Sequence, residues 1–218
     1  MKHQHGKMLE DVISLCSGRL KKFGNYDFFK DIQVLTPTKK GKLGTKELNV
    51  ALQSVLNPSK EAEKKHGERV FRIGDRVMQI KNNYDIYWEK TNRENGTGIF
   101  NGELGRITKI DDTVKQIEVQ FDDKKIAWYE YNELEQLEHS YAITIHKSQG
   151  SEFDVVIMCL PPAAPMLLTR NLLYTGITRA KKLLIVLGTK NTVEYMVQNT
   201  ETKKRNTGLE YKIRIVEY

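Results

Sequence analysis

Two segments near the C-terminal end of the sequence carry side chains suited to phosphate and nucleic-acid chemistry. The segment TIHKSQGSEFD at 144–154 places hydroxyl, imidazole, ammonium and amide groups in one short loop next to an apolar run. The segment YTGITRAKK at 174–182 presents Arg179 just before two lysines and a second apolar run. A guanidinium stays charged in proteins and offers several donors to phosphate oxygens. Both segments therefore indicate a protein that handles phosphate groups.

The loop that most often holds ATP is missing from the sequence. A phosphate loop has the pattern GxxxxGK[ST], in which backbone N–H groups and a lysine cradle the phosphates. That pattern occurs nowhere in the 218 residues. We therefore expect half of an ATP-driven machine, able to approach a nucleotide but not to hold one alone.

Composition favours a soluble globular protein with an anionic partner. Of the residues, 39% are hydrophobic and 29% are charged, and the formal net charge is +7. The longest apolar run, at 155–162, is much shorter than the roughly 20 residues that cross a bilayer, so we expect a cytoplasmic protein. Phosphates attract an excess of lysine and arginine. A generally basic composition explains the charge equally well.

The cysteines and histidines indicate neither a disulfide framework nor a metal site. The two cysteines, Cys16 and Cys159, lie in an expected helix and in an expected apolar strand. Such positions are typical of buried thiols. The five histidines show no paired metal-ligand spacing. We expect no metal ion in this chain.

The spacing of apolar residues predicts an α/β domain with an interruption. The expected helices cover 8–23, 46–57 and 169–178, and the expected buried strands cover 31–37, 140–146, 153–160 and 183–187. Strands that alternate with helices indicate a parallel sheet covered by helices on both faces. Ligands of such sheets gather beyond the carboxyl ends of the strands. We expect the loops at 36–44, 144–152 and 176–182 to adjoin those ends.

A small antiparallel β module is predicted in the middle of the chain, because the period of the apolar residues changes there to two. Its expected strands lie near 75–81, 103–110, 115–121 and 125–131, with turns at Asp111-Asp112 and Asp122-Asp123. The polar stretch 82–102 is expected to have no regular structure. The predicted division is 1–67 for the first part of the α/β domain, 68–137 for the insertion and 138–218 for the remainder.

Five segments in order resemble a helicase family. YAITIHKSQGSEFDVVI resembles motif V of superfamily 1 helicases, and YTGITRA resembles their motif VI. Three further segments resemble the C-terminal half of the RecD/TraA branch, which is exodeoxyribonuclease V alpha-like. They are DIQVLTPTKKGKLGTKELNVALQSVLNP, FRIGDRVMQIKNNYD and GIFNGELGRI. The resemblance covers nearly all of residues 30–190.

The resemblance implies a RecA-like second motor domain of the P-loop NTPase type, called 2A. It has a parallel sheet with helices on both faces and is interrupted by a small SH3-like β-barrel, called 2B. Full enzymes of the family are ATP-dependent 5′ to 3′ DNA helicases that use ATP and Mg²⁺. Their Walker lysine and Mg²⁺-binding acid belong to the preceding motor domain. We therefore expect this chain alone to bind no cofactor and to hydrolyse no ATP.

The resemblance also assigns four residues to the nucleotide. Arg179, as the arginine finger of motif VI, would neutralise charge on a transferring phosphoryl group. Lys39 stands where the family more often has arginine, and Gly150 and Glu152 match the motif V positions near the nucleotide. Alternatives remain for three of them: Arg179 capping the TGIT turn, Lys39 as a solvated charge, and Glu152 as an acid at a helix start.

The expected contacts to single-stranded DNA come from two places. The motif V loop supplies polar groups for the DNA backbone, from Thr144, His146, Lys147, Ser148 and Gln149. The β module supplies amides and aromatic faces that suit a single strand, from Asn82, Asn83, Asn101, Tyr84, Tyr87 and Trp88. For the aromatic residues, packing under a loop is the alternative, and for Asn101 it is a turn.

Three functions remain open on the sequence alone. The first is the C-terminal part of a RecD-like helicase, with single-stranded DNA and the N-terminal motor domain of the same enzyme as partners. The second is a stand-alone module that binds single-stranded nucleic acid. The third is a docking domain for a separate ATPase. The pathway of the parent enzyme, whether recombination, repair or plasmid transfer, stays open.

Overall fold

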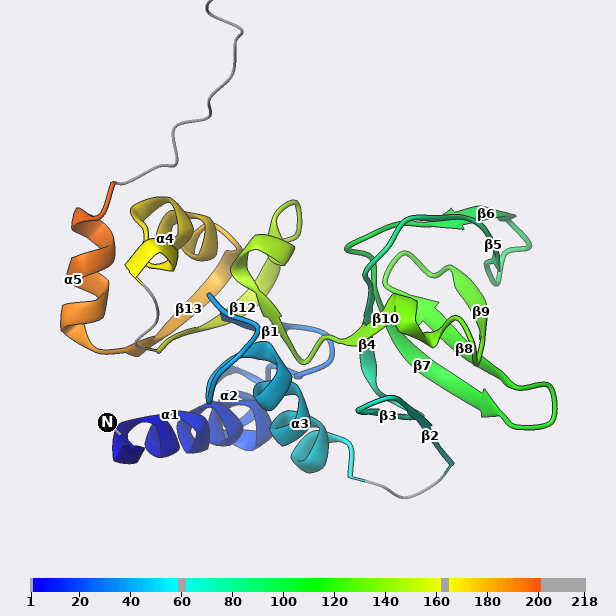
Figure 1. The fold of residues 1–218 in the computed structure, drawn as a ribbon, viewed down its shortest axis with the longest axis horizontal. Helices are drawn as coiled ribbons and strands as arrows, with labels where there is room; N and C mark the ends of the chain where they lie inside the picture. Colours follow the sequence, from blue (N-terminus) through cyan, green and yellow to red (C-terminus); the bar gives the residue numbers. More distant parts are fainter. Residues whose placement is uncertain (1, 59–61, 162–164, 201–218) are drawn as a thin grey trace, which may run out of the picture.

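A computed structural model describes residues 2–58, 62–161 and 165–200, which form two bodies side by side (Figure 1). The first body is built on a four-stranded sheet and the second on a seven-stranded sheet. Together they confirm the predicted α/β fold with a β-rich insertion. Within the described ranges, every helix is too short or too polar to cross a bilayer.

The four-stranded sheet is parallel throughout, in the order β11-β1-β12-β13. Its strands are β11 (Ala142–Thr144), β1 (Ile32–Thr36), β12 (Phe153–Leu160) and β13 (Ala180–Gly188). Val34 lies opposite Ala142 on one side, and Ile32 lies opposite Val155 on the other. All five residues of β1 are buried, as expected for a central strand covered on both faces.

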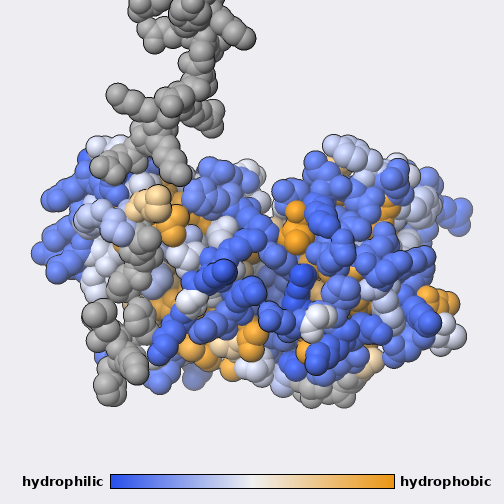
Figure 2. Space-filling model, viewed as in Figure 1, coloured by the Kyte–Doolittle hydropathy of each residue, from blue (hydrophilic) through white to orange (hydrophobic). Residues whose placement is uncertain are grey.

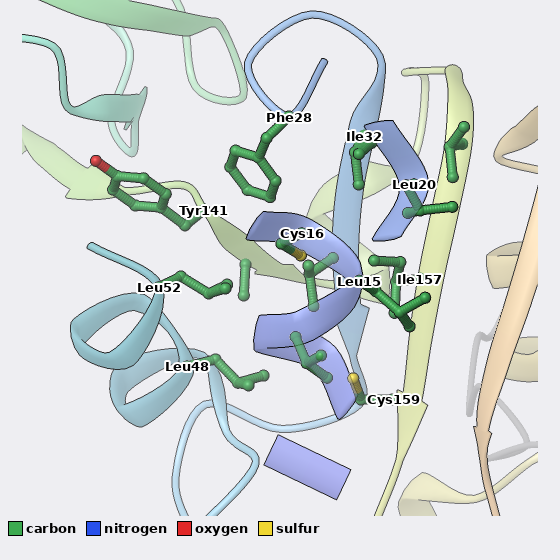
Figure 3. Packing of buried hydrophobic residues seen from close by; sticks show 14 of the residues in the cluster. Leu15, Cys16, Leu20, Phe28, Ile32, Leu48, Leu52, Tyr141, Ile157 and Cys159 are labelled. Carbon is green, nitrogen blue, oxygen red and sulfur yellow. The ribbon is translucent and has the colours of Figure 1, made fainter. Parts of the chain in front are cut away.

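One face of this sheet is covered by the N-terminal helices α1 (Lys2–Ser14) and α2 (Leu20–Gly24) and by α3 (Thr45–Leu56). A π-helical turn, η1 (Leu15–Arg19), joins α1 to α2. The expected helix at 8–23 is therefore present, with a widened turn inside it. Figure 3 shows Cys16 and Leu52 from this layer packed towards Ile157 of the sheet.

The opposite face carries the 3₁₀ turn η3 (Ile145–Ser148), α4 (Arg170–Ile177) and α5 (Lys190–Gln198). Leu172 and Leu173 of α4 pack with Met158 of β12 in a second apolar core. Thr169 caps α4 by accepting a hydrogen bond at Oγ1 from the N–H of Leu172 at 3.2 Å. The sequence did not predict α5, which follows β13 directly.

The seven-stranded sheet is antiparallel, in the order β10-β4-β7-β8-β9-β5-β6. The four strands predicted here are present as β4 (Arg76–Gln79), β7 (Leu104–Asp111), β8 (Gln116–Phe121) and β9 (Ile126–Glu130). Asp111 closes the first predicted turn by accepting hydrogen bonds from the N–H groups of Thr113 and Val114. We use "β module" for residues 63–139, which include β10 (Leu137–His139) and a short hairpin of β2 (Glu63–His66) and β3 (Arg69–Arg72).

The stretch 82–102 is largely a hairpin, so the prediction that it lacks regular structure is wrong. It forms β5 (Asn83–Glu89) and β6 (Asn95–Ile99), and β5 also pairs with β9. In β5 only Ile86 is buried. Backbone hydrogen bonds hold these strands, and the mostly exposed side chains leave no apolar alternation to reveal them.

A buried carboxylate, Asp75, joins the two bodies. Its side chain is completely inaccessible to solvent. It accepts hydrogen bonds from Gln53 and Asn57 of the α3 end, both at 2.7 Å, and contacts His139 Nε2 at 3.0 Å. Arg76 adds a second link, because Nη1 donates to the Ile32 carbonyl at 2.8 Å. These contacts fix how the β module sits on the parallel sheet.

Candidate nucleotide and nucleic-acid interface

The predicted site residues lie at both ends of the parallel sheet. Lys39 follows β1 and Thr144 is the last residue of β11, so both lie at carboxyl ends, whereas Glu152 and Arg179 come one residue before β12 and β13. The expectation that 176–182 adjoins carboxyl ends is therefore wrong. The reason is the chain order: α4 leads into β13, so the motif after α4 meets the amino end of that strand.

Arg179 is held by neutral groups of two segments. Its Nε donates to the Thr175 carbonyl at 3.2 Å, and Nη2 donates to Thr178 Oγ1 at 3.2 Å. Its Nη1 donates to the Ser151 carbonyl at 3.0 Å, across to the motif V loop. Among the described residues, no carboxylate lies within 4.0 Å of its guanidinium. Arg179 therefore caps α4 through neutral acceptors.

Gly150 and Glu152 lie on the loop that Arg179 contacts. Gly150 has φ +86°, a backbone conformation that L side chains rarely adopt, while its surroundings are open. Glu152 is exposed and pairs with Lys181 at 3.6 Å. It does not start a helix, since β12 follows directly. The structure thus brings Gly150, Glu152 and Arg179 together at one end of the sheet.

The crossover from β11 to β12 presents some of its polar groups and buries others. Thr144 caps η3, accepting at Oγ1 from the N–H of Lys147 at 3.3 Å. Ser148 is fully buried, and its hydroxyl donates to the Ile145 carbonyl at 2.7 Å. His146 and Gln149 are exposed. The side chains of Thr144 and Ser148 thus shape the loop, and those of His146 and Gln149 face solvent.

Lys147 and Lys39 share one carboxylate. Lys147 Nζ donates to Glu138 Oε2 at 2.9 Å, and Lys39 Nζ lies 3.7 Å from Glu138 Oε1. Glu138 belongs to β10 of the β module. Burial opposes ionisation of Glu138, but the hydrogen bond and charge of Lys147, with the charges of Lys39 and Arg69, lower its pKa. The structure therefore groups Lys39 with the motif V loop and the β module.

A cleft of about 480 Å³ lies between the motif V loop and the β module. On one side it is lined by Lys147, Gln149 and Gly150, and on the other by Asn101 and Lys125. Figure 2 shows a mainly hydrophilic surface with a notch between the two bodies. The cleft brings predicted DNA contacts of both bodies to one place.

The wall that the β module contributes to this cleft is acidic as well as polar. Glu103 and Asp123 line it, and both pair with Lys125, at 3.2 and 3.0 Å. Asp122 lines it too, and burial raises the pKa of its carboxyl group. The ammonium of Lys147 comes from the opposite wall. Phosphate groups are therefore favoured on the motif V side of the cleft.

The three asparagines of the β module that were predicted to contact DNA differ in how many hydrogen bonds their side-chain amides make within the fold. Asn82 Oδ1 accepts a hydrogen bond from the N–H of Asn101 at 2.9 Å, so these two lie together, and both are exposed. Asn83 Nδ2 donates to Gln136 at 3.0 Å, and its Oδ1 accepts from the N–H groups of Asp85 and Ile86. Asn83 thus uses both ends of its amide within the fold.

An aromatic pair lies beside these asparagines, and only one of its members, Tyr84, was predicted from the sequence as a contact to single-stranded DNA. Tyr84 and Phe100 are 65% and 41% exposed, and their rings meet edge to face with centroids 5.5 Å apart. Phe100 lies between the end of β6 and the Asn101-Gly102 turn, a position from which the sequence does not predict an exposed ring. Trp88 instead packs on the core of the β module, above Gly96. Exposure, which the sequence does not reveal, separates the two kinds of aromatic residue.

Neither metal ligation nor thiol chemistry is indicated by the described part of the chain. It contains no cluster of three or more histidine, cysteine, aspartate or glutamate side chains that could hold a metal ion. Cys16 and Cys159 are free and buried, and burial raises the pKa of both thiols. They serve packing.

Two known families match consecutive parts of the chain. Residues 48–121 match the family described as ATP-dependent RecD-like DNA helicase SH3 domain. Residues 139–187 match the family described as UvrD-like helicase C-terminal domain. The first match covers much of the β module, and the second runs from the end of β10 through Arg179 to β13.

Curated relatives cover most of the chain. The MJ1519 protein of Methanocaldococcus jannaschii is 34% identical over 221 residues, spanning 92% of this chain and 19% of that protein. The ATP-dependent RecD2 DNA helicase of Deinococcus radiodurans is 37% identical over 183 residues, spanning 84% of this chain and 23% of that enzyme. The RecBCD enzyme subunit RecD of Haemophilus influenzae is 28% identical, and the alignment spans 83% of this chain and 25% of that subunit. The chain therefore covers a quarter or less of these relatives.

Solved helicase structures share the fold. The structure of Pif1 helicase from Bacteroides in complex with ADP-AlF3 and ssDNA has a TM-score of 0.53 at 17% identity, covering 98% of this chain and 54% of that one. A structure of two coordinating Pif1 helicases at forked dsDNA has a TM-score of 0.50 at 18% identity, covering 97% of this chain and 52% of that one. The likeness to these two helicase structures is one of fold.

Proposed function

The chain belongs to the RecD-type branch of superfamily 1 helicases, and we propose that it is the second motor domain, with its SH3-like insertion, of an ATP-dependent 5′ to 3′ DNA helicase. In this proposal it supplies an arginine finger and contacts to single-stranded DNA. The Walker motifs belong to the N-terminal motor domain. The division 1–67, 68–137 and 138–218 is part of the proposal.

The observation that carries the proposal is the hydrogen bond from Arg179 Nη1 to the Ser151 carbonyl. It ties the residue proposed to face ATP to the loop proposed to face DNA. Arg179 gives up only neutral acceptors when it leaves this position, and a phosphate oxygen is a stronger acceptor for a guanidinium. A γ-phosphate at the domain interface would therefore compete well for Arg179. Moving Arg179 would release one contact of the motif V loop.

ATP and Mg²⁺ are proposed cofactors of the two-motor enzyme. The magnesium ion would neutralise phosphate charge from ligands on the other motor domain. On this chain, Gly150 suits a close backbone approach to the nucleotide, because its left-handed conformation orients the loop. Glu152 is exposed beside it and suits hydrogen bonds from ribose hydroxyls. Lys39 is proposed to reach phosphate, and in this structure it pairs with Glu138, which also binds Lys147.

Single-stranded DNA is the proposed ligand of the cleft. Lys147, Gln149 and Asn101 line it from both bodies, and His146 is exposed on the same loop as the first two. The acidic wall of the β module disfavours phosphates, so we place the DNA backbone on the motif V side. The bases then point to the β module, where Tyr84 and Phe100 offer aromatic surface.

The N-terminal motor domain is the proposed protein partner. Tyr174 and Ile177 on α4 are 68% and 43% exposed, close in sequence to Arg179. Apolar residues beside an arginine finger would be covered when a second motor domain closes over ATP. The same patch favours, as the second candidate, a docking domain that lends Arg179 to a separate ATPase subunit.

The test uses the isolated chain with a fluorescent oligodeoxythymidine. We expect measurable single-strand binding that weakens steeply between about 50 and about 200 mM salt, and no ATP hydrolysis above background. Absence of binding at low salt would remove the DNA-contact part of the proposal. ATP turnover that disappears with Arg179→Ala would contradict the assignment of the Walker motifs to another domain.

A further inference from the structure

Glu138 is the point where three segments of proposed function meet. It lies on β10, between Met78 of β4 in the β module and the two lysines of the α/β body. Each of its carboxylate oxygens faces a different ammonium group, Lys147 at 2.9 Å and Lys39 at 3.7 Å. The side chains of Glu138 and Lys147 are 35% and 24% exposed, so water reaches the pair only in part.

This arrangement has the charge pattern of an occupied phosphodiester site. A carboxylate and a phosphodiester each carry one negative charge spread over two outer oxygens. Two ammonium groups that face the two oxygens of Glu138 could face those of a phosphodiester in the same way. Arg69 adds further positive charge near Glu138. Without Glu138, three basic residues would surround the position.

No phosphate group fits beside Glu138 as the structure stands. The cavity bordered by Lys39, Thr45, Glu138, Thr144 and Lys147 has a volume of only about 10 Å³, which is room for about one water molecule. A phosphate that contacts both lysines must therefore replace the carboxylate. The Lys147 ammonium keeps two further N–H donors while it binds Glu138, but the carboxylate at 2.9 Å repels an incoming phosphate, so the two anions compete for Lys147.

We propose that Glu138 competes with DNA phosphate for Lys147 and Lys39, and that a phosphodiester displaces it when a single strand enters the cleft. This inference rests on the proposed function. The competition lowers the affinity for single strands. Because Glu138 is anchored on β10, its displacement also releases an ionic link between the β module and the motif V loop, so DNA binding loosens the junction of the two bodies.

The test is Glu138→Gln, which keeps the shape and removes the charge. The matched control is Glu194→Gln, which changes the net charge equally but breaks only the Lys190–Glu194 pair on α5. Binding of oligodeoxythymidine is measured by fluorescence anisotropy at several salt concentrations. We expect Glu138→Gln to bind several-fold more tightly than Glu194→Gln, with a salt slope steeper by about 0.7 for every further phosphate that the lysines neutralise.

A second measurement separates competition from a general charge effect. Adding Lys147→Gln to Glu138→Gln should remove most of the increase in affinity, whereas adding Lys190→Gln, which lowers the net charge equally but lies on α5, should leave most of it. A general charge effect predicts the same loss from both lysine substitutions. Glu138→Asp, which keeps the charge on a shorter side chain, should give an intermediate increase and serves if the glutamine variant does not fold.

The outcomes distinguish the inference from the proposed function. If the unmodified chain binds DNA but Glu138→Gln matches Glu194→Gln or binds more weakly, the inference is wrong and the proposed function stands. If binding is detected only when Glu138 is neutralised, the competition is supported in its strongest form. If neither the unmodified chain nor Glu138→Gln binds at low salt, both fail.

Discussion

The Tyr141 hydroxyl donates a hydrogen bond to Asp75 Oδ1 at 2.8 Å, within the fully buried contact between the two bodies. Tyr141 immediately precedes β11, and Asp75 immediately precedes β4. The bond therefore links the chain where it leaves the β module to the chain where it begins the seven-stranded sheet. The Asp75 carboxylate also accepts hydrogen bonds from Gln53 and Asn57. It therefore stabilises both places where the chain passes between the two bodies.

Asp75→Asn should destabilise the protein by about 3 kcal/mol, the usual cost when a buried, hydrogen-bonded charge is lost and its donors remain. Asparagine keeps the size of the side chain, but an NH₂ group replaces one of the two accepting oxygens. That NH₂ group then faces hydrogen-bond donors instead of accepting from them. Urea unfolding at neutral pH measures the loss. Asp154→Asn, which breaks the exposed pair with Lys182, is the control and should leave the midpoint near that of the unmodified protein. Equal midpoints for the two variants would contradict the importance of the buried junction.

Stability should fall in acid partly through Asp75. Burial by itself would raise the pKa of this carboxyl, but hydrogen bonds and charge from His139, with hydrogen bonds from Asn57 and Tyr141, lower the pKa below its ordinary 3.8. A carboxyl with a lowered folded pKa binds protons more readily when unfolded, so its contribution is complete above about pH 5 and is lost as pH falls through about 4 and below. Urea midpoints across that range should therefore drop more steeply for the unmodified protein than for Asp75→Asn. Parallel curves would show that Asp75 is not one of the groups responsible.

Gly176→Ala should displace α4, because a methyl group at this position would come within 2.5 Å of Met158 Sδ. Met158 can adjust, so we expect a loss of about 1–3 kcal/mol rather than unfolding. The adjustment also moves Arg179, three residues later, relative to Ser151. Thermal unfolding measures the cost. Gly6→Ala, where a methyl group would meet nothing within 4 Å, is the control.

The parallel sheet was predictable from the sequence because its strands are apolar throughout. The apolar segments around Val34 and Ile157 predict buried strands, and the structure confirms them as β1 and β12, respectively. The predicted strand at 140–146 is only partly right, because η3 begins at Ile145. The cap that Thr144 provides ends the strand there, and a polar cap on an apolar segment is hard to recognise without coordinates.

The candidate site was predictable only as a set of segments. Motif spacing indicated Arg179 and the loop around Lys147. The sequence does not show, however, which side chains of that loop are exposed to solvent and which are buried. Ser148 is buried and His146 is exposed, two positions apart. The contacts of Glu138 could not be predicted from the sequence either. Its partners Lys39 and Lys147 lie 99 and 9 positions away along the chain, respectively. Only folding brings them within reach.

Phe100→Ala should weaken binding of single-stranded DNA by about 1–3 kcal/mol if bases stack on the exposed aromatic pair. Phe100 packs edge to face on Tyr84 and lies next to Asn101 at the cleft. Phe23→Ala on α2 removes an equally large ring that is 76% exposed, and it serves as the control. Anisotropy at low salt compares the two variants. If Phe23→Ala weakens binding as much as Phe100→Ala, the aromatic pair is not a stacking surface.

Arg179 should matter in two different ways that lysine separates. In the isolated chain its bonds to Thr175, Thr178 and Ser151 cap α4, so Arg179→Ala and Arg179→Lys should both lower thermal stability slightly, by about 1 kcal/mol. In the enzyme that contains both motor domains, the finger role predicts a fall in kcat of about 10³-fold or more for Arg179→Ala, with a smaller change in KM for ATP. Lysine retains the charge but not the planar fork of donors, so it should recover only part of kcat.

A structural cap alone predicts the opposite pattern, in which kcat follows the small loss of stability and lysine and alanine behave alike. A rise in KM at unchanged kcat would place Arg179 in nucleotide binding rather than in the transition state, because only contacts that strengthen in the transition state raise kcat.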